Sequence, residues 1–193
     1  WHEQGRIPTE DMQSIRTHAA FDLDRILELE ETTKHDVIAF LTAVEEKVGP
    51  ASRFIHMGCT SSDIVDTANA LLLVQAGELI AADLDQILTT LQDMAQTHKG
   101  RLTMGRTHGV HAEPMSYGLK LAGFYAEFSR HRKRWKEALQ GIRVGKISGA
   151  VGTYAHLQPE IEARACELMD LRPDPISTQI VQRDRHAEYF SAL

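Results

Sequence analysis

The longest regular pattern of hydrophobic positions in the chain runs from Asp63 to about His98. Apolar residues recur there every three or four positions and no proline interrupts them, which is the pattern of one face of an α-helix. A helix of this length would extend about 50 Å at about 1.5 Å per residue, whereas a compact domain of this size has a radius of gyration of only about 16 Å. The pattern therefore predicts a helix in an elongated bundle, ended by Gly100.

A second long helix is predicted from Ser116 to about Leu139, again from apolar residues at helical spacing. Shorter helical patterns precede and follow these two, and Thr9 and Asp22 are the expected N-caps of the first two short helices. The remaining short helices are expected from about Lys34 to Gly49-Pro50, from Pro159 to Leu171, and onward from Arg183-Asp184-Arg185-His186.

Strand-like alternation is essentially absent from the sequence, so the expected fold class is all-α. We expect residues 1–58 to form a small N-terminal helical domain and residues 59–193 to form part of an elongated bundle of long helices. The long helices have more apolar surface than a chain of 193 residues can cover. We therefore expect their partners in other subunits, in sequence beyond this chain, or in both.

The charge composition argues against two classes of partner. The chain has 27 acidic residues and 21 Lys and Arg residues, giving a formal net charge of −6 at pH 7. This balance disfavours a nucleic-acid-binding face and a polybasic membrane patch. We recognise no signal peptide and no run of about 18 apolar residues, so a cytoplasmic location is expected. Cys59 and Cys166 fit no metal-ligand spacing and are expected to be reduced, buried residues.

The densest group of chemically active side chains lies between Gly105 and Pro114. His108 and His111 lie there with an arginine and a glutamate, where a plain connection would need only turn-forming residues. Imidazole exchanges protons near neutral pH, so this is a candidate acid–base site, with an exposed surface loop as the equal alternative. The histidine spacing also fits metal ligands, but no further ligand cluster accompanies it, and metal binding is disfavoured. Pro114 is expected to suit the first turn of the following helix.

Two further polar stretches are candidate ligand sites. Lys34-His35-Asp36 stands at a predicted helix start, where Asp36 complements the helix dipole and simple capping is the favoured interpretation. The second stretch, from His56 to Asp63, places three hydroxyl residues ahead of the first long helix. Hydroxyls at a helix start are ordinary caps, but together with the free backbone amides they also hold a carboxylate or a phosphate. The number of polar residues in this run favours ligand binding.

Two other stretches give weaker indications. The basic run from Arg130 to Arg134 is interpreted as a solvated face or a contact between subunits, with phosphate binding as the less favoured alternative. The glycine-rich stretch from Gly145 to Tyr154 lacks the spacing of a Walker motif, and no strand pattern precedes it. It is therefore only a weak candidate for a phosphate loop.

Taken in order along the chain, these stretches resemble the fumarase/aspartase superfamily, and within it the adenylosuccinate lyase branch. The resemblance covers essentially the whole chain. The sequence Thr-His-Gly-Val-His-Ala-Glu-Pro is more similar to this branch than to the fumarase or argininosuccinate branches. Five segments carry the resemblance: Lys34-His35-Asp36-Val37, His56 to Asp63, Gly105 to Pro114, Gly145 to Gly152, and Ser177-Thr178-Gln179 with Arg183 to Ala187.

The resemblance implies an anti β-elimination that releases fumarate from adenylosuccinate, giving AMP, and from SAICAR, giving AICAR, in purine nucleotide biosynthesis. It implies a small-molecule purine nucleotide substrate and no metal or organic cofactor. It also implies a homotetramer in which each active site draws residues from three subunits, and no nucleic-acid or membrane partner. Such chemistry needs a base, an acid for the departing nitrogen, and donors for the carboxylate charge.

Residue roles follow from the match to the family motifs. His108 would be the general acid, and His35 would assist it or lie near the phosphate. His56 would line the pocket. The remaining substrate-binding residues implied by the resemblance are Lys34, Asp36, Thr60, Ser61, Thr107 and Gln179. For Arg106 a structural role and a functional role are equally favoured.

The chain also departs from the family pattern. The catalytic serine of the family lies on a loop rich in Ser, Met, Pro, Lys and Asn, and no such segment occurs in these residues. The N-terminal Arg-Tyr substrate contact of the family is absent as well. We therefore expect an internal piece of a longer enzyme, truncated at both ends and inactive alone. Two alternatives stay open: a sibling lyase of the argininosuccinate or cycloisomerase type, and a helical scaffold that lost the chemistry.

Overall fold

The structure is a computed structural model that describes all 193 residues, and most of the chain is helical. This confirms the all-α class and the long-helix bundle. The elements in chain order are α1 (Thr9–His18), α2 (Leu23–Thr33), α3 (Asp36–Val48), the 3₁₀ helix η1 (Gly49–Phe54), α4 (Ser61–Thr97), β1 (Leu102–Thr107), β2 (Val110–Ser116), α5 (Tyr117–Ile142), β3 (Val144–Gly145), α6 (Pro159–Leu168), β4 (Arg172–Pro173) and α7 (Asp184–Ala192).

The chain divides into two compact units, which we describe separately. Unit 1 contains Trp1–Asn69 and Gly145–Val181, and unit 2 contains Ala70–Val144 and Gln182–Leu193. Helix α4 begins in unit 1 and continues into unit 2. The domain boundary that the sequence predicts between residues 58 and 59 stays a prediction.

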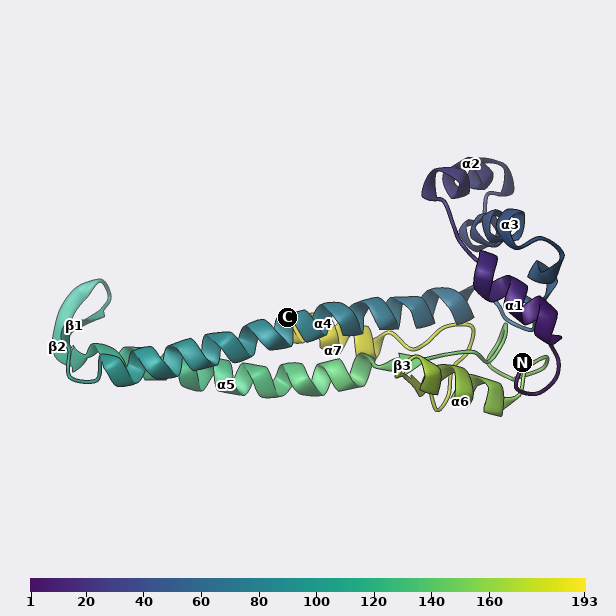
Figure 1. Ribbon diagram of the computed structural model, residues 1–193. Coiled ribbons are helices and arrows are strands. Elements are labelled where there is room, and N and C mark those ends of the chain that lie inside the picture. The colour runs from purple at the N-terminus through teal and green to yellow at the C-terminus, as the bar shows by residue number, and fades with distance from the viewer. The chain divides into compact units, whose positions relative to one another are not determined.

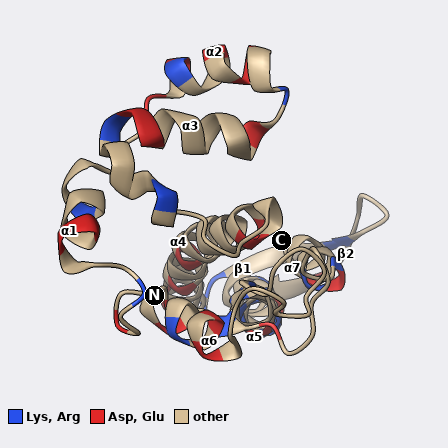
Figure 2. Cartoon of the chain, turned by 90° about the vertical axis from the view of Figure 1, so that its right-hand side faces the viewer, with Lys and Arg blue, Asp and Glu red and all other residues tan.

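Unit 1 has its N-terminal helices around a small apolar core. Val44, Val48 and Ala51 are buried, and three half-buried apolar residues from α1, α3 and the end of η1 pack against them. Figure 2 shows α2 and α3 side by side, and an exposed ion pair of 2.7 Å between Arg25 and Glu46 joins them. Asp22 caps α2, as predicted, by accepting a hydrogen bond from the backbone N–H of Arg25.

Two helix ends in unit 1 differ from the sequence prediction. Thr9 is the first residue of α1 rather than its cap, because Pro8 is already the N-cap and its carbonyl accepts from the Met12 N–H at 2.9 Å. At the other end of the unit, α6 stops at Leu168 rather than Leu171. Asp170 there adopts a left-handed backbone with φ of 54°, which ends the helical path.

Unit 2 is built from α5, the greater part of α4, and α7. Figure 1 shows α4 and α5 lying side by side, in teal and green. Trp135 of α5 is only 1% exposed, and its Nε1 donates to the carbonyl of Gly77 at 3.0 Å. Tyr189 of α7 packs against this indole with ring centroids 4.8 Å apart, and its hydroxyl donates to the Leu73 carbonyl. These contacts tie three helices together around one buried aromatic residue.

Both long helices are confirmed, with small shifts at their ends. The predicted helix from Asp63 to about His98 is α4, and the predicted helix from Ser116 is α5, for which Ser116 is the N-cap. In the basic run of α5, Arg132 pairs with Asp85 at 2.6 Å, and this pair joins α5 to α4 at their solvent-exposed side.

The sequence predicts essentially no strands, and this prediction is wrong between Leu102 and Ser116. Strands β1 and β2 pair there as an antiparallel hairpin, in which Thr107 lies opposite Val110. The two-residue connection, His108-Gly109, has positive φ at both positions, 51° and 74°, as a type I′ hairpin turn requires. Pro114 lies within β2 opposite Met104 and so does not begin the following helix. The other two short strands, β3 and β4, pair with each other.

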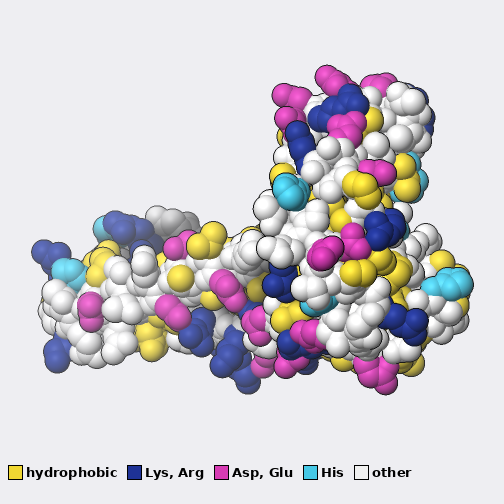
Figure 3. Space-filling view, turned by 45° about the vertical axis from the view of Figure 1, so that its right-hand side comes forward, with side chains coloured by type: hydrophobic (Ala, Val, Ile, Leu, Met, Phe, Trp, Pro, Cys, Tyr) yellow, Lys and Arg dark blue, Asp and Glu magenta, His cyan; other side chains and the backbone are white.

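Helices α4 and α5 carry large apolar side chains that this chain leaves uncovered. Leu72, Leu79 and Leu119 are 63%, 72% and 63% exposed. Hydrophobic side chains, drawn in yellow, are visible on this part of the surface in Figure 3. By length and composition alone α4 could cross a membrane, and 28% of its most apolar window is buried. The core helix of a soluble bundle has the same composition, because its partners cover the apolar faces.

Gly118 allows the start of α5 to pack directly against the end of α4. A Cβ at this position would lie 2.7 Å from the backbone of Lys99 and would also contact the Ala95 carbonyl oxygen. Backbone atoms cannot move aside as a flexible side chain can, so we expect Gly118→Ala to destabilise the folded chain by about 1–3 kcal/mol. The measurement is the thermal unfolding midpoint by circular dichroism.

Gly123, one and a half turns further along α5, is the matched control. A Cβ there would contact nothing within 4 Å, so Gly123→Ala should instead stabilise the helix by about 0.5–1 kcal/mol. Equal midpoints for the two variants would contradict the close packing assigned to Gly118.

Candidate active site

His108 occupies the tip of the hairpin in a strained backbone conformation. It is the first of the two turn residues, with φ of 51°, in the left-handed region that side chains other than those of glycine, Asn, Asp and His rarely adopt. Its side chain is exposed, and Thr107 precedes it at the end of β1. Backbone strain of this kind costs about 1–3 kcal/mol and is concentrated at functional positions. The hairpin therefore presents an exposed imidazole at its tip.

A register shift in β1 lies just before this turn. The pairing with β2 is interrupted between Met104 and Arg106, where a Cβ on Gly105 would lie 2.9 Å from the carbonyl oxygen of Glu113. Such bulges change the direction of the side chains that follow them. Gly105 thus helps to set the direction in which the turn presents its side chains.

His111 has a different environment from His108. Arg106 lies opposite it in the hairpin, and the Arg106 Nη2 is 3.1 Å from the His111 Nε2. Since a guanidinium only donates, Nε2 of His111 is the acceptor in this contact. Within the chain, no group of three or more His, Cys, Asp or Glu side chains lies close enough together to hold a metal ion.

His35 is the N-cap of α3. Its Nδ1 accepts from the backbone N–H of Ile38 at 3.4 Å and also lies 3.2 Å from a carboxylate oxygen of Asp36. Its Nε2 lies 3.4 Å from the Ser61 hydroxyl. The capping interpretation is therefore right. The capping histidine also contacts Ser61 of the three successive hydroxyl residues Thr60, Ser61 and Ser62, which we call the hydroxyl run. Lys34 precedes it with φ of 51° and a solvent-exposed side chain paired with Glu31.

The hydroxyl run stands at the N-terminus of α4. The backbone N–H of Thr60 donates to Asp63 at 2.7 Å, and Ser61 contacts His35. No hydrogen bond within the chain uses the hydroxyl of Thr60 or Ser62. A helix N-terminus with free hydroxyls and amides favours an anion. This geometry is suited to a carboxylate.

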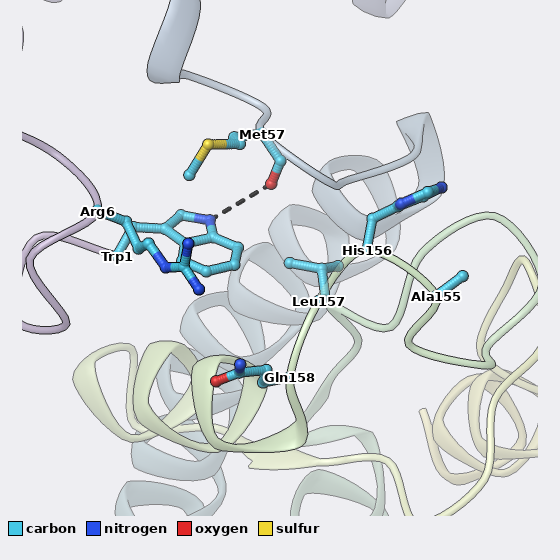
Figure 4. Close-up of a pocket in the computed structure, with 7 residues that line it drawn as sticks. All are labelled: Trp1, Arg6, Met57, Ala155, His156, Leu157 and Gln158. Carbon is cyan, nitrogen blue, oxygen red and sulfur yellow. Dashed lines mark hydrogen bonds between the residues drawn. The ribbon is translucent and has the colours of Figure 1, made fainter.

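His56 lies in the same unit, in the loop ahead of this helix. It is half-buried, has φ of 69°, and its buried Nε2 has no hydrogen-bond partner within the chain. A pocket of about 500 Å³ opens beside its neighbour Met57, whose carbonyl accepts from the Trp1 indole at 3.3 Å (Figure 4). None of the predicted site residues lines this pocket.

Gln179 is exposed in a segment that is anchored on both sides. The Ser177 hydroxyl lies 2.8 Å from that of Ser148, and the Val181 N–H donates to Asp66 in the first turns of α4 at 2.8 Å. The bond to Asp66 joins the segment to the end of α4 that carries the hydroxyl run, and the bond to Ser148 joins it to the glycine-rich loop.

The predicted site residues are thus divided between the two units. Unit 1 contains Lys34, His35, Asp36, His56, Thr60, Ser61 and Gln179, and unit 2 contains Thr107 and His108. Within unit 1 the structure brings His35 and Ser61 together.

The sequence analysis missed the part played by Asp63 and Lys146. Their side chains are completely buried and form an ion pair, and the backbone amides of Ser148 and Gly149 also donate to Asp63. The spacing Thr60-x-x-Asp63 is a capping-box signal that could have identified the carboxylate. The amides of the glycine-rich loop bind this internal carboxylate, so the structure gives no support to a phosphate loop there.

Comparison with known proteins identifies the family. The sequence profile of a family described as Lyase matches residues 3–193. The chain belongs to this lyase family. Its similar relatives include the adenylosuccinate lyase of Bacillus subtilis, 50% identical over 193 residues, and that of Synechocystis, 51% identical over 191 residues. The matches cover 100% and 99% of this chain but only 45% and 44% of those proteins.

Solved structures agree on the fold. The 3-carboxy-cis,cis-muconate lactonizing enzyme of Pseudomonas putida matches with a TM-score of 0.89 at 31% identity, over 99% of this chain and 45% of that one. A fumarate lyase from Mesorhizobium matches with a TM-score of 0.90 at 28% identity, over 98% and 46%. The chain therefore spans a little under half the length of the proteins it resembles.

Proposed function

We propose that this chain forms part of an adenylosuccinate lyase, which releases fumarate from adenylosuccinate to give AMP and from SAICAR to give AICAR. The observation that carries the proposal is the 50% identity to an adenylosuccinate lyase over every residue of the chain. The exposed His108 and the contact between His35 and Ser61 support it, because an elimination needs both an acid and a carboxylate-binding group.

The proposed reaction is an anti β-elimination. A base removes the proton from the carbon beside a succinyl carboxylate, the electron pair of that C–H bond forms the double bond of fumarate, and the bond from carbon to the purine-attached nitrogen breaks. His108 donates a proton to the departing nitrogen as general acid. The base is proposed to be a serine on a segment that has no counterpart in these 193 residues.

We assign substrate binding mainly to unit 1. Thr60 and Ser61 would hold the succinyl carboxylates at the N-terminus of α4, where the free amides and the helix dipole favour negative charge. His35, already fixed by its capping bond to Ile38, would assist the acid or lie near the phosphate, with Lys34 and Asp36 beside it. The other proposed contacts are Thr107, His56 and Gln179.

A homotetramer with shared active sites is proposed as the functional assembly. The exposed leucines of α4 and α5 support it, since the apolar faces of long helices are usually buried against other helices. The substrates are soluble nucleotides, and we propose a cytoplasmic location.

The 193-residue chain alone is expected to release no fumarate. A chimera supplies what it lacks: this chain replaces the segment that it matches in the Bacillus subtilis relative. The chimera is expected to convert adenylosuccinate, followed by the change in ultraviolet absorbance. Fumarate release by the chain alone would overturn the first expectation, and a folded, tetrameric chimera without activity would overturn the proposed function.

A cycloisomerase-type or argininosuccinate-type reaction is the second candidate, supported by the TM-score of 0.89 to a muconate lactonizing enzyme. Substrate comparison separates the candidates. The chimera should turn over adenylosuccinate and SAICAR, and neither argininosuccinate nor 3-carboxymuconate should give a comparable rate. A faster reaction with argininosuccinate or 3-carboxymuconate would mean that this compound, and not adenylosuccinate, is the substrate.

A further inference from the structure

The Asp63 carboxylate accepts hydrogen bonds from four groups in unit 1. Its side chain and that of Lys146 are both 0% exposed, and the two form an ion pair. Asp63 also accepts from the backbone amides of Thr60 at 2.7 Å, Ser148 at 3.0 Å and Gly149 at 3.2 Å, while the Lys146 ammonium donates to the Gly149 carbonyl at 2.9 Å. Burial of two charges costs several kcal/mol per ion and is tolerated only when such bonds replace water.

The bonds of Asp63 leave the Thr60 hydroxyl available to a ligand. At most helix starts the Ser or Thr side chain accepts a hydrogen bond from the backbone amide two or three residues further on. At α4 the Asp63 side chain instead binds back to the Thr60 amide, and the Thr60 hydroxyl has no partner within the chain. The run is therefore held in place without use of that hydroxyl.

The glycine-rich loop is bonded to α4 through Asp63 and also through Thr67. The Thr67 hydroxyl accepts from the Lys146 N–H at 3.0 Å and donates to its carbonyl at 2.9 Å. Further along, Ser148 contacts Ser177, close to Gln179. One buried pair thus joins the hydroxyl run at the start of α4 to the loop that holds the Gln179 segment.

We propose that Asp63 and Lys146 are positioning residues that align the Thr60 and Ser61 hydroxyls for the substrate carboxylate. The proposal rests on the proposed lyase function and adds to it two residues that do not touch the substrate. A buried ion pair is weak evidence for stability, because an uncharged pair of similar volume is often equally stable. Its contribution here is alignment, which a stability measurement alone does not detect.

The test separates binding of the two products. In the chimera, the double variant Asp63→Asn with Lys146→Met removes both charges and keeps the side-chain volumes and one acceptor oxygen. We expect it to fold, to raise KM for adenylosuccinate, and to raise the inhibition constant of fumarate at least tenfold, while that of AMP changes less than twofold. Tenfold corresponds to about 1.4 kcal/mol. Equal shifts for both products, or none, in a folded variant would overturn the proposal.

Tyr154→Phe is the matched control. It removes a hydrogen bond of 2.5 Å from the Tyr154 hydroxyl to the buried Glu162, a carboxylate that also accepts from the Ile147 N–H of the same loop but is not bonded to Asp63. The control should lower stability and leave both inhibition constants within twofold of the unmodified chimera. A tenfold change in the fumarate constant in this control would show that general loosening of the loop explains the effect, which would also overturn the proposal.

Hydrogen exchange on the 193-residue chain itself tests the alignment without reference to activity. The amides of Thr60, Ser148 and Gly149 should exchange slowly, and the double variant Asp63→Asn with Lys146→Met should speed their exchange at least 100-fold while Tyr154→Phe spares Thr60. Unchanged exchange would contradict the positioning role. If the unmodified chimera has no lyase activity, the proposed function fails by that result, and the exchange data still decide whether Asp63 holds the two segments together.

Discussion

Replacement of His108 by Asn is expected to lower kcat of the chimera by about 10²–10⁴-fold, the usual contribution of a positioned general acid. Asn is among the residues that favour positive φ in type I′ turns. The hairpin should therefore keep the backbone it has at His108, where φ is 51°. The loss is then attributable to the missing imidazole proton and not to a displaced turn. Steady-state fumarate release measures it.

His111→Asn is the control for this experiment. His111 lies on the same hairpin but accepts a hydrogen bond from Arg106, and it is assigned no part in proton transfer. Its replacement should change kcat by less than about tenfold, below the range expected for loss of a general acid. If the His108 variant retains activity, or if the two variants lose activity equally, the assignment of the acid is wrong.

Truncation of Trp135 to Ala is expected to be the most destabilising single change in unit 2. The indole is 1% exposed, packs against the tilted ring of Tyr189 and donates to the Gly77 carbonyl. Loss of a buried tryptophan costs about 3–5 kcal/mol through the cavity and the lost contacts. At about 2–4 °C per kcal/mol for a chain of this size, the thermal midpoint should fall by roughly 6–20 °C. Circular dichroism of the chain measures this fall.

Trp135→Phe distinguishes packing from hydrogen bonding. Phenylalanine keeps an aromatic ring against Tyr189 but loses the indole hydrogen bond to the Gly77 carbonyl, a loss of about 0.5–1.5 kcal/mol. The Phe variant should therefore unfold at a temperature between those of the unmodified chain and the Ala variant. A midpoint for Trp135→Ala within about 2 °C of the unmodified chain would show that this residue does not hold the three helices together, since about 1 kcal/mol or less corresponds to such a shift.

The long helices could be predicted from the sequence and the hairpin could not. In α4 and α5 the apolar residues repeat at helical spacing over many turns, so the period alone identifies them. The strands are short, mostly exposed and interrupted by Gly105 and Pro114, and they show no clean alternation. The usual signal for such a turn is Asn-Gly or Asp-Gly, and His108-Gly109 does not match it, so the sequence predicts a loop there and no hairpin.

The sequence predicts only those parts of the candidate site whose residues are close together in the chain. The hydroxyl run and the Lys34-His35-Asp36 segment are each contiguous, and motif reasoning identifies both as candidates, which stay predictions. The Asp63–Lys146 pair joins residues 83 positions apart. Nothing in the local sequence of either residue specifies the other as its partner. The buried pair depends on the fold, in which the first turns of α4 and the 145–152 loop come together.

The most direct test of the account is a product analysis of the purified chimera with adenylosuccinate. Fumarate and AMP are quantified together by chromatography, beside the His108→Asn variant. The account predicts equal amounts of the two products from the unmodified chimera, since one carbon–nitrogen bond breaks for each fumarate formed, and a loss of about 10²–10⁴-fold in both for the variant. A folded chimera that forms neither product, or a variant that forms both at the unmodified rate, would contradict it.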